Sequence, residues 1–300
     1  MGDIYGGIEA GGTKFVLAAG SHPGNLGNEI RFPTTTPDET ISRTIEYFRD
    51  LRKKYTLKAL GISSFGPLDL HKTSSSYGYI TNTPKPGWTD TDFAMRIRRA
   101  LNIPLAFDTD VNTAALAEHY WGAARNLTDF IYLTIGTGIG GGGMTGGNLM
   151  HGLIHPEMGH IMIPHDTHKD PYKGFCPFHG DCFEGLAAGP AIEGRWGKRG
   201  EMLDQNHAAW ALEAHYIASA LVNYILILSP QRIILGGGVM QQVQLFPMIR
   251  REVKSVLNQY VRASEINTAI DRFIVPAELK NHSGVLGAIA LARLEMNDAP

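Results

Sequence analysis

The sequence predicts an α/β protein built from two similar lobes. Apolar strands and amphipathic helices alternate along most of its 300 residues, which is the pattern of an α/β fold. A strand, a glycine-rich turn and a second strand begin near residue 4, and the same unit begins again near residue 130. We therefore expect an N-terminal lobe over residues 1–122 and a C-terminal lobe over residues 123–300, in a chain long enough to bury a sizeable core.

The individual elements are predicted from hydrophobic periodicity and from glycine and proline breaks. Strands are expected within residues 4–20, on both sides of the first glycine turn, and at residues 58–65, 104–107, 130–135 and 231–235. Helices are expected at residues 40–54, 91–101, 113–123, 208–228, 245–257 and 284–296, and the last could pack back on the N-terminal lobe. Residues 151–184 show little periodicity, and so long an insert tends to be functional or held together by a ligand.

Composition excludes several classes of function. The formal net charge of −2 gives no basic surface for nucleic acid or for an anionic membrane. No continuous apolar run approaches the roughly 20 residues that span a bilayer, and the N-terminus lacks the features of a secretory signal. The only two cysteines, Cys176 and Cys182, then indicate a metal rather than a disulfide. We expect a cytoplasmic protein with no nucleic-acid or membrane partner.

The first glycine turn, with the sequence EAGGTK, is a candidate anion site. Gly11 and Gly12 let backbone N–H groups approach a phosphate closely, and Thr13 adds a hydroxyl donor. Glu9 could hold Mg²⁺ directly or through water, whereas Lys14 could offer a charge or simply begin the next strand. An ordinary glycine hairpin explains this segment about as well.

The second glycine turn contains a literal GxGxxG at residues 136–141. The dinucleotide fingerprint requires a helix to follow, but more glycines follow here, and they disfavour a helix. A strand–turn–strand clamp for phosphates fits better, with Gly136, Thr137 and Gly138 at the turn. A flexible glycine loop is the alternative.

The acidic segment DTDVN lies between an expected strand and an expected helix. A carboxylate there lies at the carboxyl end of a strand, where α/β proteins bind ligands. Phosphoryl transfer to an alcohol needs a carboxylate that accepts the hydroxyl proton. Asp108 or Asp110 could do this, and Asn112 could orient the acceptor. Because these residue types are also good helix N-caps, spacing alone leaves both acids and the capping role open.

Two cysteines and two histidines could form a complete zinc site. Cys176, His179 and Cys182 are spaced to surround one ion, and His160 can complete a tetrahedron. Four protein ligands leave no open position, so the zinc would be structural and would order the irregular insert. Two free core cysteines are the alternative. Four other histidines are competing ligands: His151, His155, His165 and His168.

A third glycine cluster follows the predicted strand at residues 231–235. Gly236, Gly237 and Gly238 form a flat backbone surface that could receive adenine or ribose. A tight turn between a strand and a helix explains these glycines equally well.

Taken in order, these segments closely resemble the ROK sugar kinases of the actin/hexokinase-like superfamily, over about residues 7–292. The family's first phosphate motif, an acidic residue followed by xGGTK, begins here at Glu9. The family's catalytic motif, DxNxAxxAE, is similar to the segment from Asp110 to Glu118, and this match selects Asp110 over Asp108 as the base. The resemblance implies two actin-like lobes of the ribonuclease H-like type, with ATP and sugar bound in the cleft and frequent homodimers.

The resemblance also implies the sugar and the ligands. Glu157-x-Gly-His160 resembles the family motif whose Glu contacts sugar hydroxyls and whose His serves zinc and sugar. Cys176-x-x-His179-x-x-Cys182 resembles the bacterial zinc fructokinase branch. The implied sugar contacts are Gly66, Pro67, Asn82, Asn112, Glu157, His160 and Glu184. The implied ATP contacts are Gly11, Gly12, Thr13, Lys14, Gly136, Thr137, Gly138, Pro190, Gly236, Gly237 and Gly238.

We therefore expect an ATP-dependent fructokinase that uses Mg²⁺ and carries a structural Zn²⁺. A kinase for glucose, mannose, allose or N-acetylmannosamine is the alternative, because specificity depends on hydrogen-bond placement that sequence does not fix. A sugar-responsive repressor of the same family is disfavoured, because the phosphate motif begins at residue 7 and leaves no room for a preceding helix-turn-helix domain.

Overall fold

The computed structural model describes residues 3–300, which divide into two compact units. Among the described residues, the first unit comprises 3–125, 149–155 and 281–300. The second unit comprises residues 126–148 and 156–280. The chain therefore returns briefly to the first unit within the segment that the sequence analysis treated as a single insert.

The first unit contains the expected glycine hairpin and the expected alternation of strands and helices. Its strands are β1 (Ile4–Ala10), β2 (Lys14–Gly20), β3 (Leu26–Pro33), β4 (Leu57–Ser64), β5 (Tyr79–Ile80), β6 (Thr91–Asp92) and β7 (Leu105–Thr109). Its helices are α1 (Pro37–Arg52), α2 (Ala94–Leu101), α3 (Asp110–Trp121) and α10 (Ser283–Glu295). Strand β3, which pairs antiparallel with β2, was not among the predicted strands, and neither were the two-residue strands β5 and β6.

The second unit repeats this order of elements. Its strands are β8 (Phe130–Ile135), β9 (Ile139–Thr145), β11 (Arg232–Gly236) and β12 (Ile274–Pro276). Strand β10 (Asn148–Leu149) lies where the chain passes from the second unit back to the first. Its helices are α4 (Phe183–Ala187), α5 (Gly189–Trp196), α6 (Ala209–Leu228), α7 (Leu245–Leu257), α8 (Ser264–Asn267) and α9 (Ile270–Phe273). The short helices α4, α5, α8 and α9 were not predicted, because none is long enough to show a clear period.

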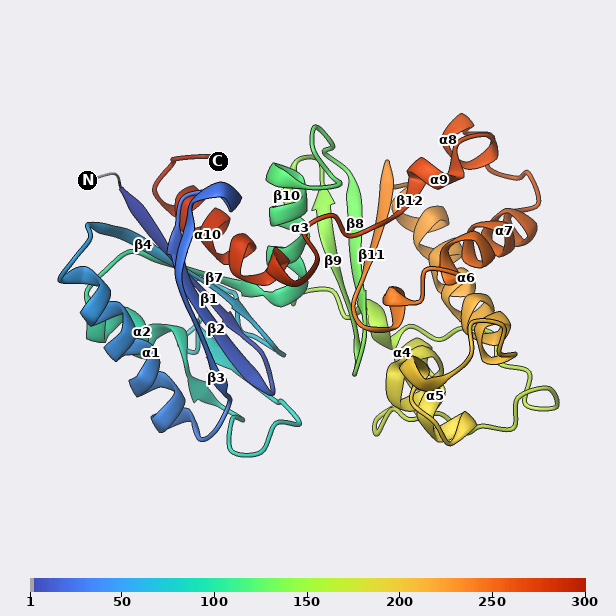
Figure 1. The fold of residues 1–300 in the computed structure, drawn as a ribbon, viewed down its shortest axis with the longest axis horizontal. Helices are drawn as coiled ribbons and strands as arrows, with labels where there is room; N and C mark the ends of the chain where they lie inside the picture. The colour runs from blue at the N-terminus through green and yellow to red at the C-terminus, as the bar shows by residue number, and fades with distance from the viewer. Residues whose placement is uncertain (1–2) are drawn as a thin grey trace. The chain divides into compact units, whose positions relative to one another are not determined.

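The two units share one sheet pattern (Figure 1). Within residues 3–300, one five-stranded sheet has the order β3-β2-β1-β4-β7 and the other the order β10-β9-β8-β11-β12. The hairpins β1–β2 and β8–β9 are antiparallel, and β1 and β8 also pair in parallel with β4 and β11. The glycine turns therefore occupy equivalent places in two equivalent sheets.

Two adjacent glycines in β1 show how helices cover both faces of the first sheet. Successive strand residues point to opposite faces. A Cβ on Gly6 would lie 2.5 Å from the ring of Phe48 in α1, whereas a Cβ on Gly7 would lie 2.7 Å from the backbone oxygen of Val285 in α10. The ring of Phe48 therefore fills the space over Gly6, and the backbone of α10 approaches Gly7 more closely than a larger residue would permit (Figure 1).

Helix α6 is the one helix within residues 3–300 that is long and apolar enough, by length and composition, to cross a membrane. The search for continuous apolar runs in the sequence did not single it out. In the structure 61% of its most apolar window is buried. A buried core helix of a soluble protein meets the same criterion, so α6 is only weak evidence for a membrane span.

Candidate active site

Asp110 is exposed at the point where β7 meets α3. The helix is capped by the preceding residue, Thr109, whose hydroxyl accepts a hydrogen bond from the Asn112 N–H at 3.2 Å. Asp110 is instead the first residue of the helix, and its Oδ1 accepts the Val111 N–H at 2.9 Å. The positive end of the helix dipole favours the charged carboxylate there. Because Thr109 is the N-cap, the capping role does not account for Asp110.

Asp108, the other candidate acid, is buried and engaged. It is 3% exposed. Its Oδ2 lies 2.8 Å from His151 Nε2, and its Oδ1 accepts hydrogen bonds from the Thr109 N–H and from Asn112 Nδ2, at 2.7 and 3.1 Å. The hydrogen bond to Asp108 raises the pKa of His151, and partial burial opposes the shift. These contacts engage both carboxylate oxygens of Asp108, although Asp108 also lines the cavity described below and Asp110 does not.

The segment 149–155 is held to the rest of the first unit by three side chains besides Asp108. Asn112 Nδ2 donates to the Met150 carbonyl at 3.1 Å. His155 Nε2 accepts the Leu68 N–H at 3.0 Å, and His71 Nε2 lies 2.5 Å from the Leu153 carbonyl. The sequence analysis considered His151 and His155 only as competing zinc ligands, because nothing in their spacing signals contacts with residues 68–108.

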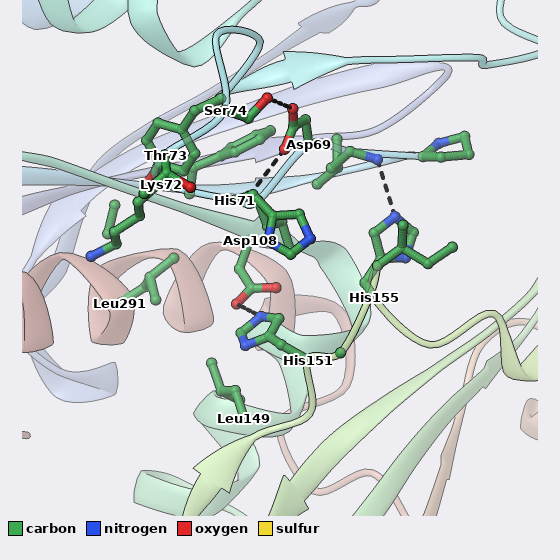
Figure 2. A pocket seen from close by; sticks show the side chains of 18 of the residues that line it. Asp69, His71, Lys72, Thr73, Ser74, Asp108, Leu149, His151, His155 and Leu291 are labelled. Atoms are coloured by element: carbon green, nitrogen blue, oxygen red, sulfur yellow. Dashed lines mark hydrogen bonds and ion pairs between the residues drawn. The ribbon is translucent and has the colours of Figure 1, made fainter.

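A cavity of about 910 Å³ lies beside these contacts, wholly within the first unit. Figure 2 shows Asp108, His151 and His155 at its wall, with residues 69–74 on the opposite side. Pro67, a predicted sugar contact, lines it, and Gly66 lies against His155. Asn82 is exposed and is not among the lining residues. The cavity therefore places one predicted sugar contact, Pro67, beside Asp108 of the acidic segment.

The first glycine turn is partly exposed and is fixed by Thr34, the residue that follows β3. The Gly11 N–H donates to the Lys14 carbonyl at 3.0 Å, and the Thr34 hydroxyl donates to the Gly11 carbonyl at 2.6 Å. A Cβ on Gly12 would meet nothing within 4 Å, so the turn presents open backbone. Thr13 and Lys14 are both exposed, and Lys14 begins β2.

Glu9, the possible magnesium ligand, lies at the start of α10. Its carboxyl group is within 3 Å of the position that a Cβ on Gly284 would take, and it accepts a hydrogen bond from the Val285 backbone. Burial raises the pKa of Glu9, and Lys14 opposes that shift. A carboxylate at a helix N-terminus is favourable in itself, so this geometry gives Glu9 a structural role whether or not it meets a metal.

The second glycine turn borders a cavity of about 530 Å³ in the second unit. Four predicted ATP contacts line it: Gly136, Thr137, Pro190 and Gly238. Gly237 has a φ of +90°, and a Cβ there would lie 2.3 Å from the Ile135 carbonyl oxygen, so only glycine fits. Arg199 and Trp210 also line the cavity. The sequence analysis missed both, because neither belongs to a glycine motif.

The four predicted zinc ligands lie together in the second unit. The ligand atoms of His160, Cys176, His179 and Cys182 all lie within 4.8 Å of one another. Cys176 Sγ is 3.7 and 3.6 Å from Nδ1 of His160 and His179, and Cys182 Sγ is 3.6 Å from Nδ1 of His160. A tetrahedral Zn²⁺ with ordinary bond lengths separates sulfur and nitrogen ligands by about 3.6 Å, so the donor set fits zinc. Burial raises the pKa of the Cys182 thiol to about 11, and zinc binding would displace that proton.

The acids near the zinc ligands have different surroundings. Glu157 is exposed and immediately precedes the short 3₁₀ turn Met158–His160. Glu184, in α4, is half-buried, and its Oε2 accepts the Ile139 N–H at 2.8 Å. The predicted sugar contact Glu184 therefore touches the end of the second glycine turn.

Two glycine turns at sheet hairpins and an exposed carboxylate at the end of a strand are the parts of a phosphotransferase site. Residues 5–295 match the ROK family, and the chain belongs to that family. It is 52% identical over 289 residues to a “Putative fructokinase” of Bacillus subtilis (strain 168), covering 96% of this chain and 95% of that protein. It is 44% identical over 295 residues to a fructokinase of Lactococcus lactis subsp. cremoris, covering 97% and 98%.

The fold has close structural counterparts. A ROK family glucokinase from Streptomyces griseus, solved with glucose and AMPPNP, superposes with a TM-score of 0.74 at 22% identity, covering 97% of this chain and 99% of that one. The predicted family and the actin/hexokinase-like α/β fold are confirmed.

Proposed function

We propose that this protein is an ATP-dependent fructokinase that converts D-fructose to fructose 6-phosphate. The observation that carries the proposal is the exposed Asp110 carboxylate at the start of α3, with Thr109 as the cap and Asp108 engaged by His151. The identity of 44–52% to fructokinases over nearly the whole chain supports fructose as the sugar.

In the proposed reaction Asp110 accepts the proton of the sugar's C6 hydroxyl. That oxygen forms a bond to the γ-phosphorus of ATP, and the bond between this phosphorus and the β–γ bridging oxygen breaks to release ADP. Backbone N–H groups of the two glycine turns would stabilise the charge on the phosphates. Asn112, Glu157 and Glu184 would pair with sugar hydroxyls, each of which offers a donor and an acceptor.

The metals have separate proposed roles. Mg²⁺ would neutralise charge on the phosphates, and Glu9 offers an oxygen ligand for it. Zn²⁺ would be held by His160, Cys176, His179 and Cys182, and would order the loop between the first and last of them. We expect a cytoplasmic homodimer, whose mass light scattering would measure.

An ADP-release assay with a panel of hexoses and N-acetylmannosamine tests the function. Fructose should have the highest kcat/KM. A higher kcat/KM for glucose, mannose or allose would assign the same chemistry to another sugar, and no sugar-dependent ADP release would refute the proposal.

A further inference from the structure

We infer that Glu184 is a positioning residue for the nucleotide. Its side chain holds the turn at residues 136–138 against the end of the zinc loop. The zinc loop is defined here as residues 160–182, from the first zinc ligand to the last. The inference rests on the proposed ATP and zinc sites. It gives Glu184 a role that is separate from contact with the sugar.

Glu184 holds one end of the turn. Its Oε2 accepts the N–H of Ile139, the first residue of β9, at 2.8 Å. The same oxygen lies 2.7 Å from the position that a Cβ on Gly138 would take. The carboxylate therefore packs directly on the turn, and it can do so because residue 138 has no side chain.

Gly189 holds the other end of the turn. Its N–H donates to the Gly136 carbonyl at 2.7 Å, and the next residue, Pro190, lines the nucleotide cavity. The Ala188 N–H donates to the Glu184 carbonyl at 3.0 Å, which ties the two anchors together through α4. One short segment, residues 184–189, therefore makes hydrogen bonds to both ends of the turn. Any shift of that segment would move the backbone N–H groups of the turn, which are proposed to bind the phosphates.

The same segment starts at a zinc ligand. Cys182 is the N-cap of α4, and its carbonyl accepts the Leu186 N–H at 3.0 Å. The Phe183 N–H donates to the Ile161 carbonyl at 2.9 Å, beside the ligand His160. Zinc bound at Cys182 would thus fix the position of the residue at which α4 begins. Glu184 and Gly189, which hold the two ends of the turn, follow Cys182 closely in the chain. Loss of zinc should loosen the nucleotide turn as well as the loop.

The test measures binding of AMP-PNP without sugar, by isothermal titration calorimetry, so that any sugar contact of Glu184 has no effect. Glu184→Ala should weaken binding about 10-fold, the scale of losing one hydrogen bond to a charged group. Glu184→Gln retains an acceptor oxygen and should stay within about threefold of the wild type. Glu265→Ala removes a carboxylate that is exposed and lies outside the nucleotide cavity, and it should have no effect.

Zinc removal supplies the second arm. Chelation should weaken AMP-PNP binding by the wild type about as much as Glu184→Ala does. It should cause little further loss of affinity in the Glu184→Ala variant, because both changes act on the same link between the zinc loop and the turn. Melting temperature and zinc content show that each variant is folded and loaded. Wild-type affinity for AMP-PNP in folded Glu184→Ala would overturn this inference but not the proposed function. Fully additive losses of affinity from zinc removal and from Glu184→Ala would do the same. No AMP-PNP binding by the zinc-loaded wild type would overturn the proposed function too.

Discussion

Replacing Asp110 by Asn is the most direct test of the catalytic assignment. Asn has nearly the same shape, and its side-chain oxygen can still accept the Val111 N–H that Asp110 accepts at 2.9 Å. The variant loses the negative charge of the carboxylate and, with it, the ability to take a proton. Removing a general base lowers rates by about 10²–10⁴-fold, so kcat should fall at least about 100-fold, equivalent to about 2.7 kcal/mol of activation free energy.

The stability of this variant should change little. Asp110 is exposed, and its charge contributes about 0.3–1 kcal/mol at a helix N-terminus. At about 2–4 °C per kcal/mol for a large domain, the melting temperature should fall by no more than a few degrees. A coupled ADP-release assay with saturating fructose and ATP measures kcat, and differential scanning fluorimetry measures stability.

Asp108→Asn is the matched control, because Asp108 is the neighbouring carboxylate and is buried against His151. It should lose more stability and less kcat than Asp110→Asn. If Asp110→Asn kept turnover within about 10-fold of the wild type while Asp108→Asn lost 100-fold, the assignment of the base would be wrong.

Three further predictions concern other parts of the chain. Elemental analysis should find stoichiometric zinc in protein purified without chelator, and Cys176→Ser should lose the metal and melt at a lower temperature; zinc-free wild type would refute the site. Gly237→Ala should cost about 1–3 kcal/mol of unfolding free energy from backbone strain alone, and more because the new Cβ would clash with the Ile135 backbone. Gly197 also has a positive φ, but a Cβ there would meet nothing within 4 Å, so Gly197→Ala should cost only the strain. His151 has a raised pKa in the folded protein, so its pairing with Asp108 should contribute fully below the unfolded pKa of about 6.5 and be lost as pH rises through the folded value. The difference in unfolding free energy between wild type and His151→Ala should therefore shrink as the pH rises above about 6.5; a difference that grew with pH would contradict the pairing.

Much of the scaffold could be predicted from the sequence because its signals are local. Apolar periodicity located α6 and α7 within a residue of their ends, and the glycine turns marked both hairpins. Strand β3 was missed because Asn28, Glu29 and Arg31 interrupt its apolar residues. That strand is held by pairing with β2, and such long-range pairing overrides local preference.

The candidate site was predictable only where a motif carried it. Asp110 and the predicted zinc ligands lie in short motifs with fixed spacing. The contact that separates Asp110 from Asp108 is made by His151, 43 residues further along the chain, and no spacing rule reports a pair so far apart. Arg199 follows α5 and Trp210 lies near the start of α6. Both line the cavity beside the second glycine turn because of tertiary packing.

The two sheets also show why similar turns need different supports. Both turns join an antiparallel hairpin next to a parallel strand. The first is fixed by Thr34, at the end of the neighbouring strand, whose N–H donates to Thr13 at 2.9 Å and whose hydroxyl donates to Gly11. The second receives its anchors from Glu184 and Gly189, which follow the last zinc ligand. Repetition of the sheet thus accounts for the position of both turns, whereas the rigidity of the second depends on an insert that the first unit lacks. Zinc should therefore affect the nucleotide through the second turn, and leave the support of the first turn unchanged.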